Sequence, residues 1–166
     1  MPLEEIVAAL PKQVKVKLGI HFLEIGLPIW EKFAKESGDN LSYYAFMVGM
    51  ETVNPQIINS SIQLARQWIS PQSFSLQEEL KLYLKKLVDR FSMHLSGIKD
   101  WELELDPHPK LIFYSALNLL DYINGKTNTF SNESTIYLSI NQSIDAIVKA
   151  KLLTWDEVNG ILKNYK

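Results

Sequence analysis

The sequence predicts an all-α fold: a single-domain bundle of six to seven helices, with a kinked N-terminal helix and a central buried helix. Three observations predict it. Apolar residues recur at steps of three and four along nearly the whole chain, which places them on one face of a helix. Capping residues, prolines and glycines separate these runs at helix length. No internal repeat, low-complexity tract or long linker divides the 166 residues, so residues 1–166 are expected to form a single helical domain.

The first long helix is expected where six apolar residues step by 4, 4, 3, 4 and 4: Val14, Leu18, Phe22, Ile25, Ile29 and Phe33. Pro28 falls inside this run. It has no N–H to donate to the Glu24 carbonyl, and its ring presses on the same turn. We therefore expect a kink or break near Gly26.

The middle of the chain predicts three further helices. A short one is expected over residues 41–53. The Asn-Pro pair at 54–55 starts the next, since a capping side chain precedes a proline at the first helical position; its buried stripe is Ile58, Ile62, Ala65 and Ile69. The best-defined helical pattern runs over about residues 76–95, and a capping box formed by Ser75 and Glu78 starts it.

The C-terminal part predicts the centre and the edge of the bundle. Residues 109–124 are apolar on nearly every side, as expected for a helix in the middle of a bundle, and Gly125 is its stop signal. A helix over about 133–153 follows, and Thr154 with Glu157 caps a last short one. Aromatic residues on or near the helical stripes are expected in the core: Trp30, Trp68, Trp155 and the pair Tyr43-Tyr44.

Composition excludes several classes of function. A net charge of −2 gives no field that would gather phosphates, so nucleic acid is not an expected partner. The chain has no cysteine, which removes disulfides, thiolate metal sites and cysteine nucleophiles and fits a reducing compartment. Its start, MPLEEIVAALPK, lacks the basic residues and long apolar core of a secretory signal, so a cytoplasmic location is expected. No apolar run approaches about 18 residues, so neither a membrane span nor a membrane partner is expected.

The sequence contains few motifs of catalysis or metal binding. No nucleophile elbow, P-loop, dinucleotide fingerprint or zinc-protease motif occurs, so we expect no catalytic residues, no cofactor and no enzyme activity. His21 and Glu24 share a helix face at i, i+3, which is the spacing of half a di-metal carboxylate site. A second such pair is missing, because Asp89 and His94 project about 140° apart around a helix. No metal is therefore expected, and His21 should lie beside Phe22 with its polar edge in water.

Residues 100–106, DWELELD, form the most unusual segment. Its acids and its tryptophan, followed by a histidine between two prolines, are the expected protein-binding residues: Asp100, Trp101, Glu102, Glu104, Asp106 and His108. We expect an ordered connector, with the prolines forcing extended geometry before the next helix. His108 either helps to cap that helix or belongs to a contact surface.

Two interpretations of this segment make opposite predictions. If Trp101 and Leu105 close the end of the bundle, Trp101→Ala should lower the free energy of unfolding by about 3 kcal/mol or more. If the segment is a docking surface, the same change should leave the melting temperature nearly intact and weaken binding instead.

A resemblance adds a functional hypothesis. Residues 21–39 read HFLEIGLPIWEKFAKESGD, and the later stretches FYSALNLLDYINGK and INQSIDAIVKA follow in pattern. The first stretch resembles the opening of small all-helical bacterial proteins that include immunity proteins of polymorphic toxin systems. The comparable positions are Glu24, Leu27, Pro28, Trp30, Phe33, Glu36, Gly38 and Asp39; a basic pair typical of the family after its first aromatic-rich helix is missing here. The resemblance implies an all-helical protein without catalytic residues that acts by binding another protein.

Three functional hypotheses follow. The first is a cytosolic helical protein-binding module of the immunity or antitoxin type, which neutralises a toxin by occlusion. The second is a helical-bundle enzyme or metalloprotein using His21, Glu24 and His94. The third is a structural homo-oligomer. The expected partner is accordingly another protein, such as a toxin, or a second copy of the chain.

Overall fold

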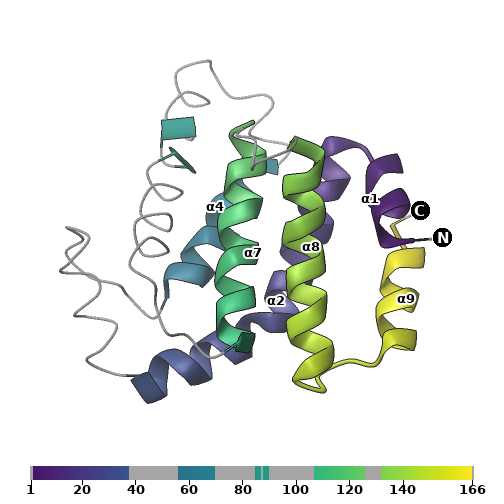
Figure 1. The fold of residues 1–166 in the computed structure, drawn as a ribbon. Helices are drawn as coiled ribbons and strands as arrows, with labels where there is room; N and C mark the ends of the chain where they lie inside the picture. Colours follow the sequence, from purple (N-terminus) through teal and green to yellow (C-terminus); the bar gives the residue numbers. More distant parts are fainter. Residues whose placement is uncertain are drawn as a thin grey trace.

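The chain folds into a helical bundle, as the sequence predicts. The computed structural model describes residues 2–37, 56–69, 85–86, 88–89, 107–125 and 132–165. Its helices there are α1 (Leu3–Ala9), α2 (Lys12–Ser37), α4 (Ile57–Ile69), α7 (Pro107–Ile123), α8 (Asn132–Lys149) and α9 (Trp155–Lys163) (Figure 1). All regular structure within the described residues is helical, which confirms the all-α fold.

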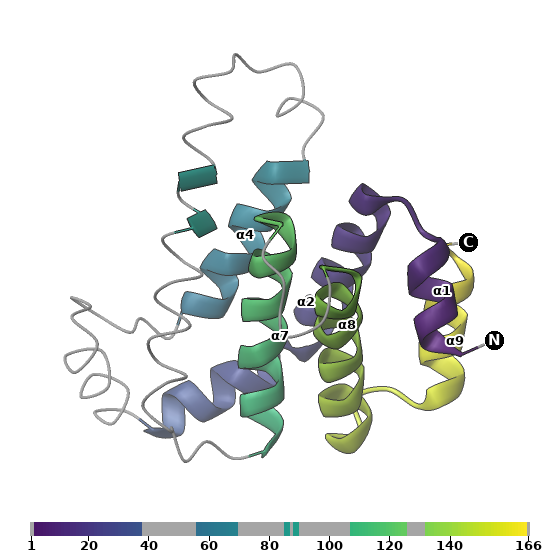
Figure 2. The ribbon, with the colours of Figure 1, turned by 45° about the horizontal axis from the view of Figure 1, so that its top comes forward.

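Helix α7 is the central element. It packs against α2, α4 and α8, and most of its side chains are buried. This confirms the central position predicted from its all-round apolar sequence. In both ribbon views α1 and α9 lie side by side beyond α8, and the two chain termini lie close together (Figures 1 and 2).

Helix α2 continues through its proline. The helix is unbroken from Lys12 to Ser37 with Pro28 inside it, and its two ends run in different directions (Figure 1). The predicted kink is therefore present, and the predicted alternative of a break is not. Leu23 and Trp30 are both fully buried on either side of the proline, and this packing holds the helix together where a hydrogen bond is missing.

Two helix boundaries differ from the sequence prediction. The prolines at 107 and 109 do not precede α7 in extended geometry; they form its first turn together with His108. Proline is tolerated there because the first N–H groups of a helix have no intrahelical acceptor. Helix α8 ends at Lys149 rather than near residue 153.

A Schellman motif explains the early end of α8. The Leu152 N–H donates to the Ile147 carbonyl at 3.0 Å, and the Lys151 N–H donates to the Val148 carbonyl at 3.0 Å. This pattern needs a left-handed residue, and Lys151 supplies it with a φ of 58°. Because glycine usually fills this position, the sequence carries no visible stop signal.

The start of α9 matches its prediction. The Thr154 hydroxyl accepts from the Glu157 N–H, and the Glu157 carboxylate accepts from the Thr154 N–H at 2.7 Å, which completes the capping box. The backbone N–H of Thr154, and secondly its hydroxyl, donate to the Glu157 carboxylate; both bonds favour the ionised form and hold the pKa of Glu157 below its usual value. At the end of α7, Gly125 takes a φ of +70°, which confirms the predicted stop.

Other predictions meet the structure only in part. In α4, Ile58, Ile62 and Ala65 are buried as expected. Of the helix predicted over 76–95, the described residues 85–86 and 88–89 are helical. The helix predicted over 41–53, including its tyrosine pair, lies outside the described residues.

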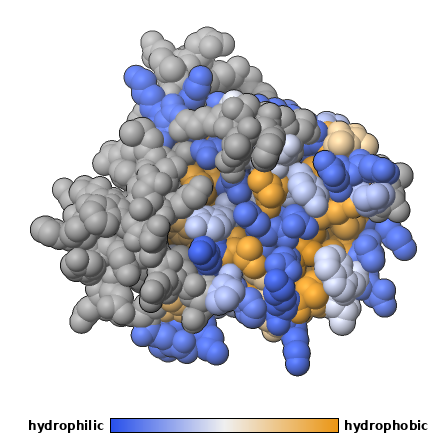
Figure 3. Space-filling view, in the orientation of Figure 1, coloured by the Kyte–Doolittle hydropathy of each residue, from blue (hydrophilic) through white to orange (hydrophobic). Residues whose placement is uncertain are grey.

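The surface over α7 and α8 is largely hydrophilic, with apolar patches separated by polar side chains (Figure 3). Separate patches of this kind are ordinary on a folded surface. No helix among the described residues is long and apolar enough to cross a membrane.

Two glycines should respond in opposite ways to the same substitution. A Cβ on Gly26 would collide with Ile112 Cδ1 and lie 3.6 Å from Ile147 Cγ1, whereas a Cβ on Gly160 meets nothing within 4 Å. Gly160→Ala should raise the free energy of unfolding by about 0.5–1 kcal/mol because alanine is the better helix former. Gly26→Ala should lower it by about 1 kcal/mol, since overpacking outweighs that gain. Urea unfolding followed by circular dichroism measures both, and stabilisation by Gly26→Ala would contradict the close approach of α7 to α2.

Candidate functional site

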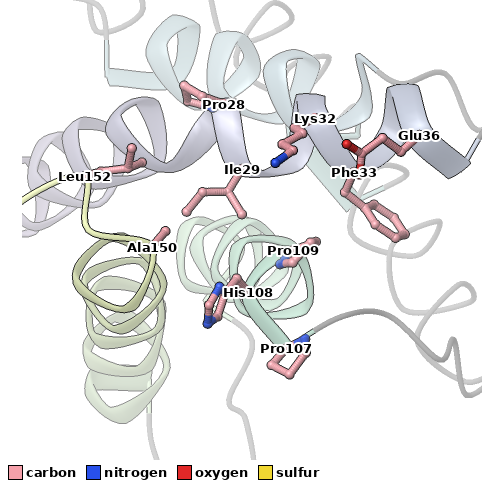
Figure 4. A pocket seen from close by; sticks show the side chains of 10 residues that line it. All are labelled: Pro28, Ile29, Lys32, Phe33, Glu36, Pro107, His108, Pro109, Ala150 and Leu152. Carbon is pink, nitrogen blue, oxygen red and sulfur yellow. The ribbon is translucent and has the colours of Figure 1, made fainter.

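A hollow opens at the end of the bundle where α7 begins. It encloses about 590 Å³ between α2, the first turn of α7 and the chain that follows α8 (Figure 4). Its apolar lining comes from Pro28, Ile29, Phe33, Pro107, Pro109 and Leu152, and its polar lining from Lys32, Glu36 and His108. A volume of this size accommodates a small ligand or the anchoring side chains of a partner protein.

Each part of the lining has a local cause. Ile29 and Phe33 are four residues apart on α2 and therefore project from the same face. In Figure 4, Ile29 and Lys32 face the N-terminal turn of α7, where His108 and Pro109 lie. Leu152 borders the hollow because the Schellman motif turns the chain sharply after α8.

Two large apolar side chains near this hollow are exposed. Among the described residues, Leu152 is 44% and Trp155 is 54% exposed, and no other large hydrophobic residue is comparably exposed. They are three positions apart in the sequence, so their Cα atoms lie no more than about 11 Å apart. Exposed tryptophan is the residue type most enriched among the residues that dominate protein–protein binding energy.

The core position predicted for Trp155 is therefore wrong. Trp155 is the first residue of α9, and Val158 and Leu162 continue its helical spacing inward and are buried. The stripe was identified correctly, but its first residue lies past the edge of the core. Trp30 is fully buried as predicted, and Trp68 is half-buried against the core.

The predicted binding residues meet this hollow at one described position. His108 is half-buried and lines it, within the first turn of α7 rather than in the exposed loop that the sequence suggested. Asp100, Trp101, Glu102, Glu104 and Asp106 lie outside the described residues.

The described lining of the hollow combines apolar walls with a few charged groups. The side chains that line it in the described structure include no serine, threonine or cysteine beside His108, so nothing there forms a nucleophile–base pair. Apolar walls with a few charged groups instead suit an apolar anchor flanked by polar contacts.

A second hollow holds the other predicted pair. His21 and Glu24 share one face of α2, as the spacing predicts, and line a hollow of about 430 Å³ with Lys17, Arg66 and Tyr165. His21 Nδ1 lies 2.8 Å from the Tyr165 hydroxyl, and the carboxylate of Glu24 forms an ion pair with Arg66. The His21 ring stacks on Phe22.

These partners bear on the metal-site hypothesis. His21 already contacts the phenol of Tyr165, and Glu24 already contacts the guanidinium of Arg66. Both groups would compete with a metal ion. Within the described part of the chain, no three histidine, cysteine or acidic residues gather closely enough to hold an ion. His94, the third residue of that hypothesis, lies outside the described residues.

Comparison of the chain with protein-family models, with curated proteins and with solved structures finds no match.

Proposed function

We propose that this chain is a cytosolic helical protein-binding module of the immunity type, which neutralises a toxin protein by covering its functional surface. The observation that carries the proposal is the exposure of two large apolar side chains: Leu152, which lines the hollow where α7 begins, and Trp155, three positions further along the chain. The exposed side chains of Leu152 and Trp155 lose the stabilisation that burial of apolar surface provides. A bound partner would bury this surface. Tryptophan at such a position is the residue type most often found to dominate binding energy.

Charge selects the kind of partner. The seven residues directly before Pro107 contain four acids, and Glu36 adds a carboxylate to the lining of the hollow itself. Opposite charge on the partner raises the association rate and excludes wrong partners. The matching surface is a basic cleft around an apolar anchor. The absence of cysteine fits action in a reducing compartment.

Co-expression with the product of the neighbouring gene tests the proposal. The wild-type chain should restore growth if that product is toxic, and the two proteins should form a stoichiometric complex at physiological salt. Trp155→Ala should weaken the complex by about 30-fold or more, the loss typical of a dominant contact. The matched control is Gln63→Ala, an exposed position on α4 that lines neither hollow, which should leave affinity unchanged.

Two results would overturn the proposal. One is a neighbouring gene product that is harmless and forms no complex. The other is an affinity that Trp155→Ala leaves unchanged. Melting curves of both variants must match the wild type, since Trp155 adds little to the core.

A second copy of the chain is the competing occupant of this surface, because an exposed apolar pair also suits a symmetric dimer. Light scattering at two concentrations separates the two. A monomer at both concentrations supports a different partner protein. A mass that doubles with concentration in the wild type, and does not in Trp155→Ala, would assign the surface to self-association.

A further inference from the structure

The second hollow carries an inference that does not rest on the proposed function. It lies between α2, the C-terminal end of α4 and the residue after α9, three segments far apart in the sequence. Its volume of about 430 Å³ falls within the range of small-molecule sites. Its lining combines apolar walls with convergent polar groups, the arrangement by which such sites orient a ligand.

The contact between His21 and Tyr165 leaves one hydrogen-bond donor on this pair of side chains. The contact between His21 Nδ1 and the Tyr165 hydroxyl uses one hydrogen. If Nδ1 accepts it, the ring keeps its Nε2–H; if Nδ1 donates, the phenol keeps its O–H. Either way the pair retains one donor for a further acceptor. Burial raises the pKa of Tyr165, which keeps the phenol protonated.

Charge in the hollow favours an anion. Lys17 and Arg66 contribute two positive charges against the single carboxylate of Glu24, although the whole chain carries a net charge of −2. The Arg66–Glu24 ion pair engages part of the guanidinium. A guanidinium has five N–H groups, so donors remain for a second oxygen-bearing group. Glu24 is the single acid among the described residues that line this hollow.

Apolar surface completes the site. Ile20 and Ile69 form part of the lining. The ring of Tyr165 lies 5.8 Å from the His21 ring, measured between centroids. These groups would contact the carbon chain of a ligand whose charged end meets Lys17 and Arg66.

We propose that this hollow binds a small oxyanion, a carboxylate or phosphate that carries a short apolar chain. The anionic oxygens accept hydrogen bonds from Lys17 and Arg66 and from the donor kept by the His21–Tyr165 pair. The apolar chain lies along Ile20 and Ile69.

Titration of the full chain with three probes tests this site. Hexanoate and hexyl phosphate carry the two candidate head groups on the same chain, and hexanol is the neutral control, all at constant ionic strength. The readout is the NMR signals of the His21 and Tyr165 rings together with the dissociation constant from calorimetry. At least one anion should shift both rings with a millimolar or lower dissociation constant. Hexanol should bind at least about 10-fold more weakly, and the stronger of the two anions identifies the head group.

Variants locate the binding. Lys17→Gln should weaken the anion about 5-fold and Arg66→Gln about 10-fold, since each removes a charged donor. Lys35→Gln removes an exposed charge at the other end of α2 and should have no effect. Among the described residues no side chain pairs with Lys17, so its substitution remains informative even if Arg66→Gln disturbs folding by leaving Glu24 unpaired.

Three outcomes would overturn the site: no ring shift with either anion up to about 10 mM, equal binding of hexanol, or anion binding that survives Lys17→Gln unchanged. None of them bears on the protein partner, because the exposed pair at residues 152 and 155 is not part of this hollow.

Discussion

Trp30→Ala is expected to lower the free energy of unfolding by about 4 kcal/mol. The Trp30 side chain is fully buried. Its ring lies 5.6 Å from that of Phe33 and 5.9 Å from that of Phe113, measured between centroids. Removing it leaves a cavity between α2 and α7 that the rigid helices cannot close. Since a domain of this size has a free energy of unfolding of only about 5–15 kcal/mol, the substitution should remove a large part of it.

Trp155→Ala is the matched control, because it removes the same side chain from an exposed position. It should change the free energy of unfolding by no more than about 0.5 kcal/mol. Guanidinium unfolding followed by circular dichroism compares the two variants directly. Equal losses in both would mean that Trp155 contributes to the core, and the proposed docking surface would lose its main support.

Ser115→Leu should have the second large effect, about 4 kcal/mol, from added volume and lost hydrogen bonds together. The contact between α7 and α8 is built on three fully buried serines. The Ser115 hydroxyl donates to the Ser139 carbonyl at 2.6 Å, and the Ser139 hydroxyl donates to the Ser115 carbonyl at 2.8 Å. Ser115 Oγ also lies 2.6 Å from Ser143 Oγ. Side chains this small let the two helices approach closely, and a leucine would force them apart.

Ser115→Ala separates the two causes. It removes the hydrogen bonds without adding volume, so about 1–2 kcal/mol should be lost. Urea unfolding of the pair gives both values. If Ser115→Leu costs no more than Ser115→Ala, the helices can move apart freely and the close serine contact does not specify their pairing.

Much of the fold follows from local sequence patterns. Residues 109–124 are apolar on nearly every side of a helix, which predicted the central helix. The stripe of apolar residues along α4 predicted its buried face. Gly125 and the Thr154–Glu157 capping box marked helix ends correctly, because each acts through its own backbone and a near neighbour. Helix-end signals that act over a few residues can be recognised in the sequence without knowledge of the rest of the chain.

The errors occurred where a residue permits two local outcomes. Proline is compatible both with an extended segment and with the first turn of a helix. The sequence therefore did not predict that α7 begins at Pro107 rather than after Pro109. Lys151 adopts a left-handed conformation that its sequence does not announce. Trp155 has the right spacing for burial and yet lies past the edge of the core.

The sequence by itself determined the all-α class, the central helix and the separation of buried from exposed faces, since helical period and capping act within a few residues. Only the tertiary structure decided the two hollows. One joins α2, α7 and the turn after α8, and the other brings His21 to Tyr165, which is 144 residues away. His108, a predicted contact residue, lines the first hollow. In the second hollow, His21 and Glu24 lie beside the phenol of Tyr165 and the guanidinium of Arg66. Such placements depend on how helix faces pack against one another, and periodicity specifies which face is buried without specifying its neighbour.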